Sequence, residues 1–121
     1  MDVRQKTEKI EIEGRELTIT CNFGVLADVQ EQYDGNLLRA LEDARKKPLR
    51  VALIWAAAMI NDALDAAGEG KRYTAAQLGR VLPTYMPGAF TDKIMGLVWA
   101  ALEPPAEEKA ETGEEATAEK N

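Results

Sequence analysis

Hydrophobic and polar residues alternate near the start of the chain. In residues 8–13 (Glu-Lys-Ile-Glu-Ile-Glu) apolar and charged side chains take turns, and the alternation resumes in residues 16–20 (Glu-Leu-Thr-Ile-Thr). A period of two is typical of a β-strand with one buried face. Gly14 lies between the two runs and is free to adopt a positive φ. The pattern therefore predicts an N-terminal β-hairpin.

From Asn22 onward the apolar residues recur every three or four positions, which is the period of an amphipathic helix. The first such run, residues 23–33, precedes Gly35, which suits a left-handed C′ position after the helix. Its expected apolar face includes Phe23, Leu26, either Val29 or Gln30, and Tyr33. The second run, residues 37–45, follows Asn36 as a helix cap and is expected to turn its leucines inward (Leu37, Leu38 and Leu41).

Three more helices are predicted in the rest of the chain. The run 48–67 is apolar nearly all round, which indicates a helix packed on several sides. Thr74-Ala-Ala-Gln77 matches a capping box and starts a short helix that ends at Leu82. The run 88–103 carries one clear apolar face (Phe90, Ile94, Leu97, Val98 and Ala101). The predicted fold class is mainly α (α+β), a small helical bundle with an N-terminal β-hairpin.

Length and composition divide the chain into one domain and two flanking segments. At 121 residues it is long enough for a single domain. Residues 104–121 hold six Glu and two Lys but no aromatic residue and no leucine, so they are expected to form a disordered acidic tail. This tail carries −4 of the net charge of −6. We expect a flexible N-terminus over residues 1–7 and a hairpin plus helical-bundle domain over residues 8–103.

The residue types needed for catalysis and metal binding are scarce. The sequence has no histidine and a single cysteine, Cys21, which argues against a zinc site and against a thiol nucleophile with a histidine base. Asp62 and Asp65 lack the spacing of a calcium-binding loop, and residues 68–71 (Gly-Glu-Gly-Lys) match neither nucleotide-binding fingerprint. The sequence therefore predicts no enzyme, no metal and no cofactor.

The charge and hydropathy patterns also argue against nucleic-acid and membrane partners. The densest cationic group (Arg45, Lys46, Lys47 and Arg50) is interpreted as favourable charge at a helix C-terminus rather than as a phosphate-binding surface. The longest apolar run, residues 51–60, is shorter than the ~20 residues that cross a bilayer. The first residues are polar and do not resemble a signal peptide. We expect a soluble intracellular protein.

A second apolar stripe lies on the last predicted helix. Met95, Trp99 and Leu102 are spaced i, i+4, i+7, to one side of the main apolar face. Together the two stripes cover roughly 200° of the helix surface, although ~100° suffices for a surface helix. Either neighbouring elements bury the second stripe, or it is a docking surface for another protein. These three residues are the candidate protein-binding residues, since binding surfaces favour Met and Trp.

The layout resembles the tail assembly chaperones of long-tailed bacteriophages, of the siphophage and gene-transfer-agent type. The resemblance lies in the hairpin 10–19, in residues 22–28 with their Phe23-Gly24 step, and in the alanine-rich helix around Trp55. Residues 35–41, the helix start at 73–79 and the Glu/Pro/Ala-rich tail also match, so that most of residues 8–121 is covered.

This resemblance implies a role in the cytoplasm of the infected host and absence from the mature virion. A chaperone of this family binds the tape measure protein, keeps it soluble and helps recruit tail tube subunits, in many members through a frameshift-extended form. Many copies would coat one tape measure protein, and self-association of the chaperone is an open possibility.

Two other classes of protein remain as alternatives. The first is a small structural virion protein, either a head–tail connector or a minor tail subunit. The second is a helix-turn-helix regulator formed by residues 74–102, but the second helix there offers only Lys93 as a cation, beside Asp92. Mass spectrometry of purified particles separates a chaperone from a structural subunit.

Overall fold

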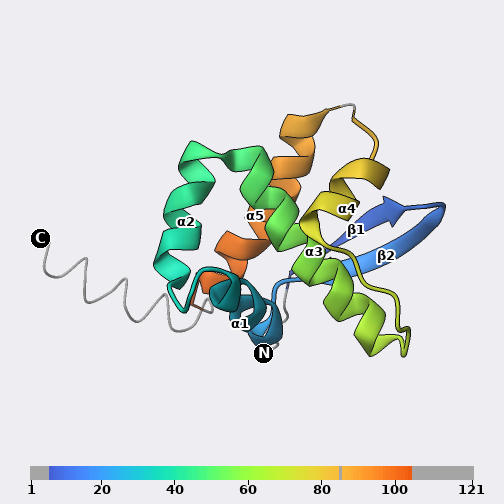
Figure 1. Cartoon of the computed structure of the whole chain (residues 1–121), viewed down its shortest axis with the longest axis horizontal. Helices are drawn as coiled ribbons and strands as arrows, with labels where there is room; N and C mark the ends of the chain where they lie inside the picture. The colour runs from blue at the N-terminus through green and yellow to red at the C-terminus, as the bar shows by residue number, and fades with distance from the viewer. Residues whose placement is uncertain (1–5, 85, 105–121) are drawn as a thin grey trace, which may run out of the picture.

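The computed structural model describes residues 6–84 and 86–104, which form one hairpin followed by five helices (Figure 1). The elements are β1 (Thr7–Ile12), β2 (Arg15–Thr20), α1 (Phe23–Gln32), α2 (Leu37–Lys46), α3 (Pro48–Ala66), α4 (Ala75–Val81) and α5 (Pro87–Leu102). This confirms the predicted fold class, mainly α with an N-terminal hairpin. Apart from Pro104, the predicted acidic tail lies outside the described residues, as do residues 1–5 of the predicted flexible N-terminus.

The hairpin is closed by a two-residue turn. Glu13 and Gly14 both have positive φ, at 50° and 81°, as a type I′ turn requires. The turn sets an antiparallel register in which Ile12 opposes Arg15 and Ile10 opposes Leu17. The buried residues are therefore the apolar ones of the alternating pattern (Ile10, Ile12, Leu17 and Ile19).

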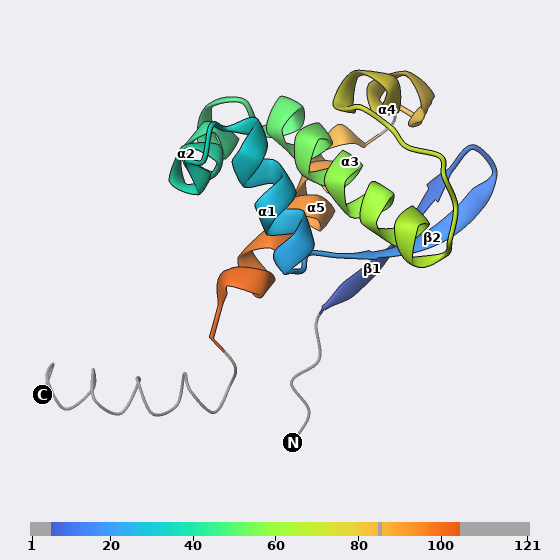
Figure 2. The same cartoon turned by 60° about the horizontal axis from the view of Figure 1, so that its bottom comes forward.

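Helix α3 is the centre of the fold. It contacts β2 and each of the other four described helices, and Figure 2 shows these elements arranged around it. Val51, Trp55, Met59 and Ile60 are fully buried. Several alanines of α3 are buried between them, which lets the neighbouring elements pack closely. The prediction that this helix packs on several sides is confirmed.

The start of α1 explains the Phe23-Gly24 step of the sequence. The Asn22 side chain accepts a hydrogen bond from the Val25 amide at 3.0 Å and donates one to Asp62 of α3 at 2.8 Å. A Cβ on Gly24 would lie 3.3 Å from Asn22 Oδ1. Glycine at position 24 therefore leaves room for the cap that joins α1 to α3.

The end of α1 differs in one detail from the prediction. The C-cap is Tyr33, so the left-handed C′ position falls on Asp34 (φ 55°) rather than on Gly35. Gly35 follows, also with positive φ, and its amide donates to the Gln30 carbonyl at 2.9 Å. The Asp34 amide donates to the Glu31 carbonyl at 3.1 Å, which completes a Schellman motif.

Two predicted core residues are exposed. Phe23 is 88% exposed and Leu38 is 65% exposed, so their placement on inward faces was wrong. The buried residues are Val25 and Val29 on α1 and Ala40 on α2. Each exposed residue lies two positions before a buried one, and two positions correspond to about 200° around a helix. The other predicted residues, Leu26 and Tyr33 on α1 and Leu37 and Leu41 on α2, pack against the core, so only Phe23 and Leu38 lie off the covered faces.

Candidate protein-binding surface

The three candidate residues of α5 separate into one core residue and two surface residues. Met95 is 8% exposed and packs in the core with Ile94, Leu97 and Val98. Trp99 is 47% exposed and Leu102 is 40% exposed. The structure thus places Trp99 and Leu102 where another protein can reach them, whereas Met95 contributes to the fold.

Phe23 belongs to the same end of the molecule and was missed as a surface residue. It lies in the first turn of α1, and in both views this turn and the last turns of α5 are neighbours (Figures 1 and 2). One signal in the sequence was available: Phe23 directly follows the cap Asn22, and a residue in this first position has no preceding turn to cover it. Three large apolar side chains are therefore exposed at this end.

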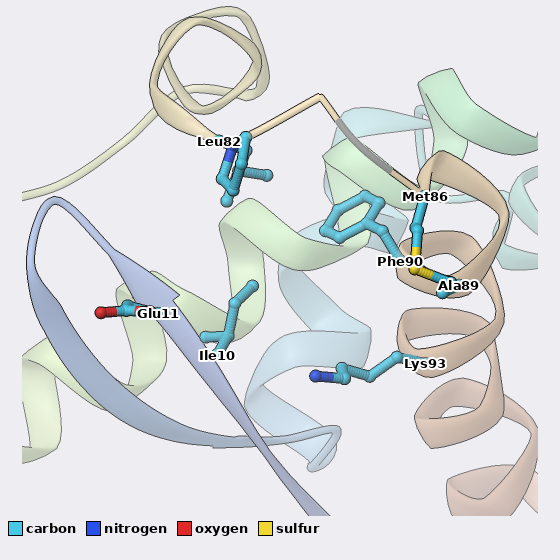
Figure 3. A pocket seen from close by; sticks show the side chains of 8 residues that line it. Ile10, Glu11, Leu82, Met86, Ala89, Phe90 and Lys93 are labelled. Atoms are coloured by element: carbon cyan, nitrogen blue, oxygen red, sulfur yellow. The ribbon is translucent and has the colours of Figure 1, made fainter.

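An apolar pocket lies between β1 and the start of α5 (Figure 3). Its volume is about 290 Å³, and Lys93 extends across one side toward the strand. The Lys93 ammonium donates to the Lys9 carbonyl at 2.9 Å. Met86 at the rim is exposed, with a left-handed φ of 58°. The walls of the pocket are Ile10, Glu11, Leu82, Pro83, Met86, Ala89, Phe90 and Lys93.

Residues with metal-binding or nucleophilic side chains are spread over the described part of the chain. Within residues 6–84 and 86–104, no group of three His, Cys, Asp or Glu side chains is placed to hold a metal ion. Cys21 is buried, and this burial raises the pKa of its thiol to about 11. At neutral pH the thiol is therefore protonated, and Cys21 behaves as a small apolar residue of the core.

The cations around the α2–α3 junction fit the interpretation from sequence. Arg45 and Lys46 lie in the last turn of α2, where positive charge is favourable beside the helix C-terminus.

Among the helices of the described segments, none combines the length and the apolar run that crossing a membrane requires.

Ion pairs join the hairpin turn to the loop before α4. Arg15 makes a bidentate pair with Glu69 at 2.6 and 2.7 Å, and Lys71 pairs with Glu13 at 2.8 Å. The Tyr73 hydroxyl also donates to Glu13, and the Lys71 ammonium lies 5.1 Å from the centre of the Tyr73 ring. Hydrogen bonds from Lys71 and then Tyr73 hold the pKa of Glu13 below its usual value, and a hydrogen bond from Arg15 does the same for the pKa of Glu69.

We expect the double variant Glu13→Gln/Glu69→Gln to be less stable than the natural chain at neutral pH and nearly equal to it at acidic pH. Both carboxylates have a folded-state pKa below the ordinary value of 4.5, so their contribution is present above that pH and disappears as pH falls through the lowered values. Both are solvent-exposed, which keeps the effect small. Thermal melts of the two proteins at neutral and acidic pH measure it, and a difference that stays constant with pH would contradict it.

Comparison of the chain with protein-family models, with curated proteins and with solved structures finds no match.

Proposed function

We propose that this chain is a phage tail assembly chaperone. In this role it binds the tape measure protein, keeps it soluble and helps recruit tail tube subunits in the host cytoplasm, and it is left out of the mature virion. The observation that carries the proposal is the exposure of Trp99 and Leu102 in the last turns of α5, with Phe23 at the same end. The resemblance in sequence layout to this family supplies the identity of the partner.

The exposed side chains suit an apolar helix as a partner. As the resemblance implies, a tape measure protein is long and helical and exposes apolar stripes until the tail tube surrounds it. An amphipathic helix binds through apolar side chains at i, i+3, i+4 and i+7 spacing, and Trp is enriched among the residues that dominate such interfaces. Trp99 and Leu102 lie three positions apart on α5, so both can contact one helix of the partner.

Charge and copy number fit the same role. Residues 104–121 carry −4 of the net charge of −6, and net charge far from zero opposes aggregation of a complex. When many copies coat one long partner, contacts that are weak individually suffice through multivalency. A small exposed surface on each copy is therefore compatible with the proposed activity.

Co-expression with the large tape measure protein of the same gene cluster tests the proposal. We expect the natural chain to keep the partner soluble and to co-purify with it. Trp99→Glu should lower the soluble, co-purified amount by about tenfold, because the substitution places a charge in the apolar contact. The matched control is Leu38→Glu on α2, which changes another exposed apolar residue in the same way and should retain the activity.

Equal loss in both variants, or none in either, would show that the end of α5 is not the contact. If the natural chain leaves the partner insoluble and does not co-purify with it, the proposal fails. In that event mass spectrometry of purified particles decides for the alternative, a small structural virion protein, if the chain is present there in fixed stoichiometry.

A further inference from the structure

Four cations lie together at the corner where α2 ends and α3 begins. Arg45, Lys46, Lys47 and Arg50 are all exposed, and we call them the corner patch. Residues 45–50 contain no acidic side chain, so the patch carries a charge of +4. Figure 1 shows this corner at the upper end of α2, where the chain turns into α3. Within the described residues, none of the four cations is ion-paired.

The cations of the hairpin and of the loop before α4 differ in this respect. Each of them pairs with a carboxylate, and the pairs are Lys9 with Glu16, Arg15 with Glu69, Lys71 with Glu13, and Arg72 with Asp65. The corner patch is therefore a dense group of exposed cations that the described part of the chain leaves without partners.

The helix dipoles favour only two of the four cations. Arg45 and Lys46 lie in the last turn of α2, where the dipole is negative. Lys47 lies between the two helices, and Arg50 lies in the first turn of α3, at the positive end of that helix dipole. The first turn of α3 contains no acidic residue. Lys47 and Arg50 therefore add positive charge that the helix dipoles do not offset.

The chain carries a matching negative charge after α5. Residues 105–121 hold six Glu and two Lys, a net charge of −4 that is equal and opposite to the charge of the corner patch. This acidic segment follows the end of α5, which both views place on the same side of the molecule as α2 (Figures 1 and 2). Seventeen residues span up to about 56 Å, whereas a domain of about 100 residues has a radius of gyration of about 13 Å. The acidic segment is therefore long enough to reach the corner patch.

We propose that the acidic segment 105–121 binds the corner patch of its own chain. Contacts between exposed charges are individually weak and are screened by salt. The covalent connection compensates for this weakness, because a ligand on a short linker is present at a millimolar effective concentration. The bound segment neutralises the patch and keeps other polyanions, such as nucleic acids, away from it. The proposal does not depend on the tape measure protein, because neither the corner patch nor the acidic segment belongs to the surface proposed to contact that protein.

A nitroxide label on the acidic segment of the full-length chain tests this contact. Thr112→Cys places the label near the middle of the segment, and Cys21 stays unlabelled because it is buried and its thiol is protonated at neutral pH. At low salt the label should broaden the amide NMR signals of residues 45–50 several times more than those around Arg80, an exposed cation that stands alone on α4. In 1 M salt, where the Debye length is about 3 Å, this difference should disappear.

Charge variants of the labelled chain separate an electrostatic contact from mere proximity. Neutralising the corner patch with glutamine should abolish the selective broadening. Replacing the six glutamates of the segment with glutamine should do the same (Glu107, Glu108, Glu111, Glu114, Glu115 and Glu119). The matched control is Lys109→Gln/Lys120→Gln, which makes the segment more negative and should strengthen the broadening.

Broadening that is no stronger at the corner patch than around Arg80 overturns the proposal, and so does broadening that survives neutralisation of the six glutamates. A mixture of isotope-labelled chains without nitroxide and unlabelled chains with nitroxide reports contacts between copies. Broadening of the corner patch as strong in this mixture as within one chain would show that the segment binds another copy, which also overturns the proposal. Circular dichroism shows whether each variant is folded. If the patch variant is unfolded, the glutamate variant decides the test, because it changes only residues outside the described part of the chain.

Discussion

Replacing Trp55 with alanine is expected to destabilise the protein by about 3–5 kcal/mol, the usual cost of removing a fully buried aromatic side chain. Trp55 is completely buried in α3, the helix that contacts all the other described helices. The cavity left by an indole ring would open between several elements at once, and the backbone of a central helix cannot move to close it. Urea unfolding followed by circular dichroism measures the change.

Trp55→Phe tests the contribution of the indole N–H to stability apart from that of the apolar ring. The indole Nε1–H of Trp55 is buried without a hydrogen-bond partner in the described part of the chain, and an unsatisfied buried donor costs about 1–3 kcal/mol. Phenylalanine removes that donor and keeps most of the apolar volume. We therefore expect Trp55→Phe to change the free energy of unfolding by only about 1 kcal/mol. A loss as large as that of Trp55→Ala would contradict this expectation, because the lost ring volume would then outweigh the removal of the unsatisfied donor.

Trp99→Ala is the matched control for the Trp55 series. The same chemical change at a half-exposed position should cost less than about 1 kcal/mol, because little apolar area is lost from the core. Each single variant also retains one tryptophan, so fluorescence reports a buried indole in Trp99→Ala and a solvent-exposed one in Trp55→Phe.

The elements that sequence predicted well are those whose signals are local. The hairpin rests on a period of two around Glu13 and Gly14, and its register follows from the turn. The capping box of α4 is present as expected, with Thr74 and Gln77 each bonding to the backbone of the other at 2.9 and 3.0 Å. Both signals act within a few residues, so no knowledge of the distant chain is needed to interpret them.

Which single residues at the edges of the α1, α2 and α5 faces are exposed could not be settled in this way. Which side of a helix is covered depends on contacts with elements that are distant in sequence, such as the hydrogen bond between Asn22 and Asp62. Ala40 is buried and Leu38 exposed, although side-chain size predicts the opposite. The spacing of Met95, Trp99 and Leu102 likewise could not show that Met95 belongs to the core while the other two reach the surface. The candidate surface was therefore predicted only in part.

Asn61→Ala is expected to cost about 2–3 kcal/mol, a large effect for a residue that is only half-buried. The Asn61 side chain donates to the Tyr73 carbonyl at 2.9 Å and accepts from the Tyr73 amide at 2.8 Å. These two bonds tie the segment before α4 to α3. Tyr73 is buried, so its backbone groups cannot simply exchange Asn61 for water. Thermal or urea unfolding of the variant measures the cost.

Asn61→Asp tests whether both bonds matter. A carboxylate still accepts from the Tyr73 amide, but it cannot donate and faces the Tyr73 carbonyl oxygen with negative charge. We expect this variant to be destabilised at neutral pH and to recover as pH falls toward ~4, where a protonated carboxyl can donate again. Asn61→Ala should show no such recovery relative to the natural chain. If the two variants follow the same pH dependence, the bond to the Tyr73 carbonyl contributes little, and the amide bond alone holds this segment against α3.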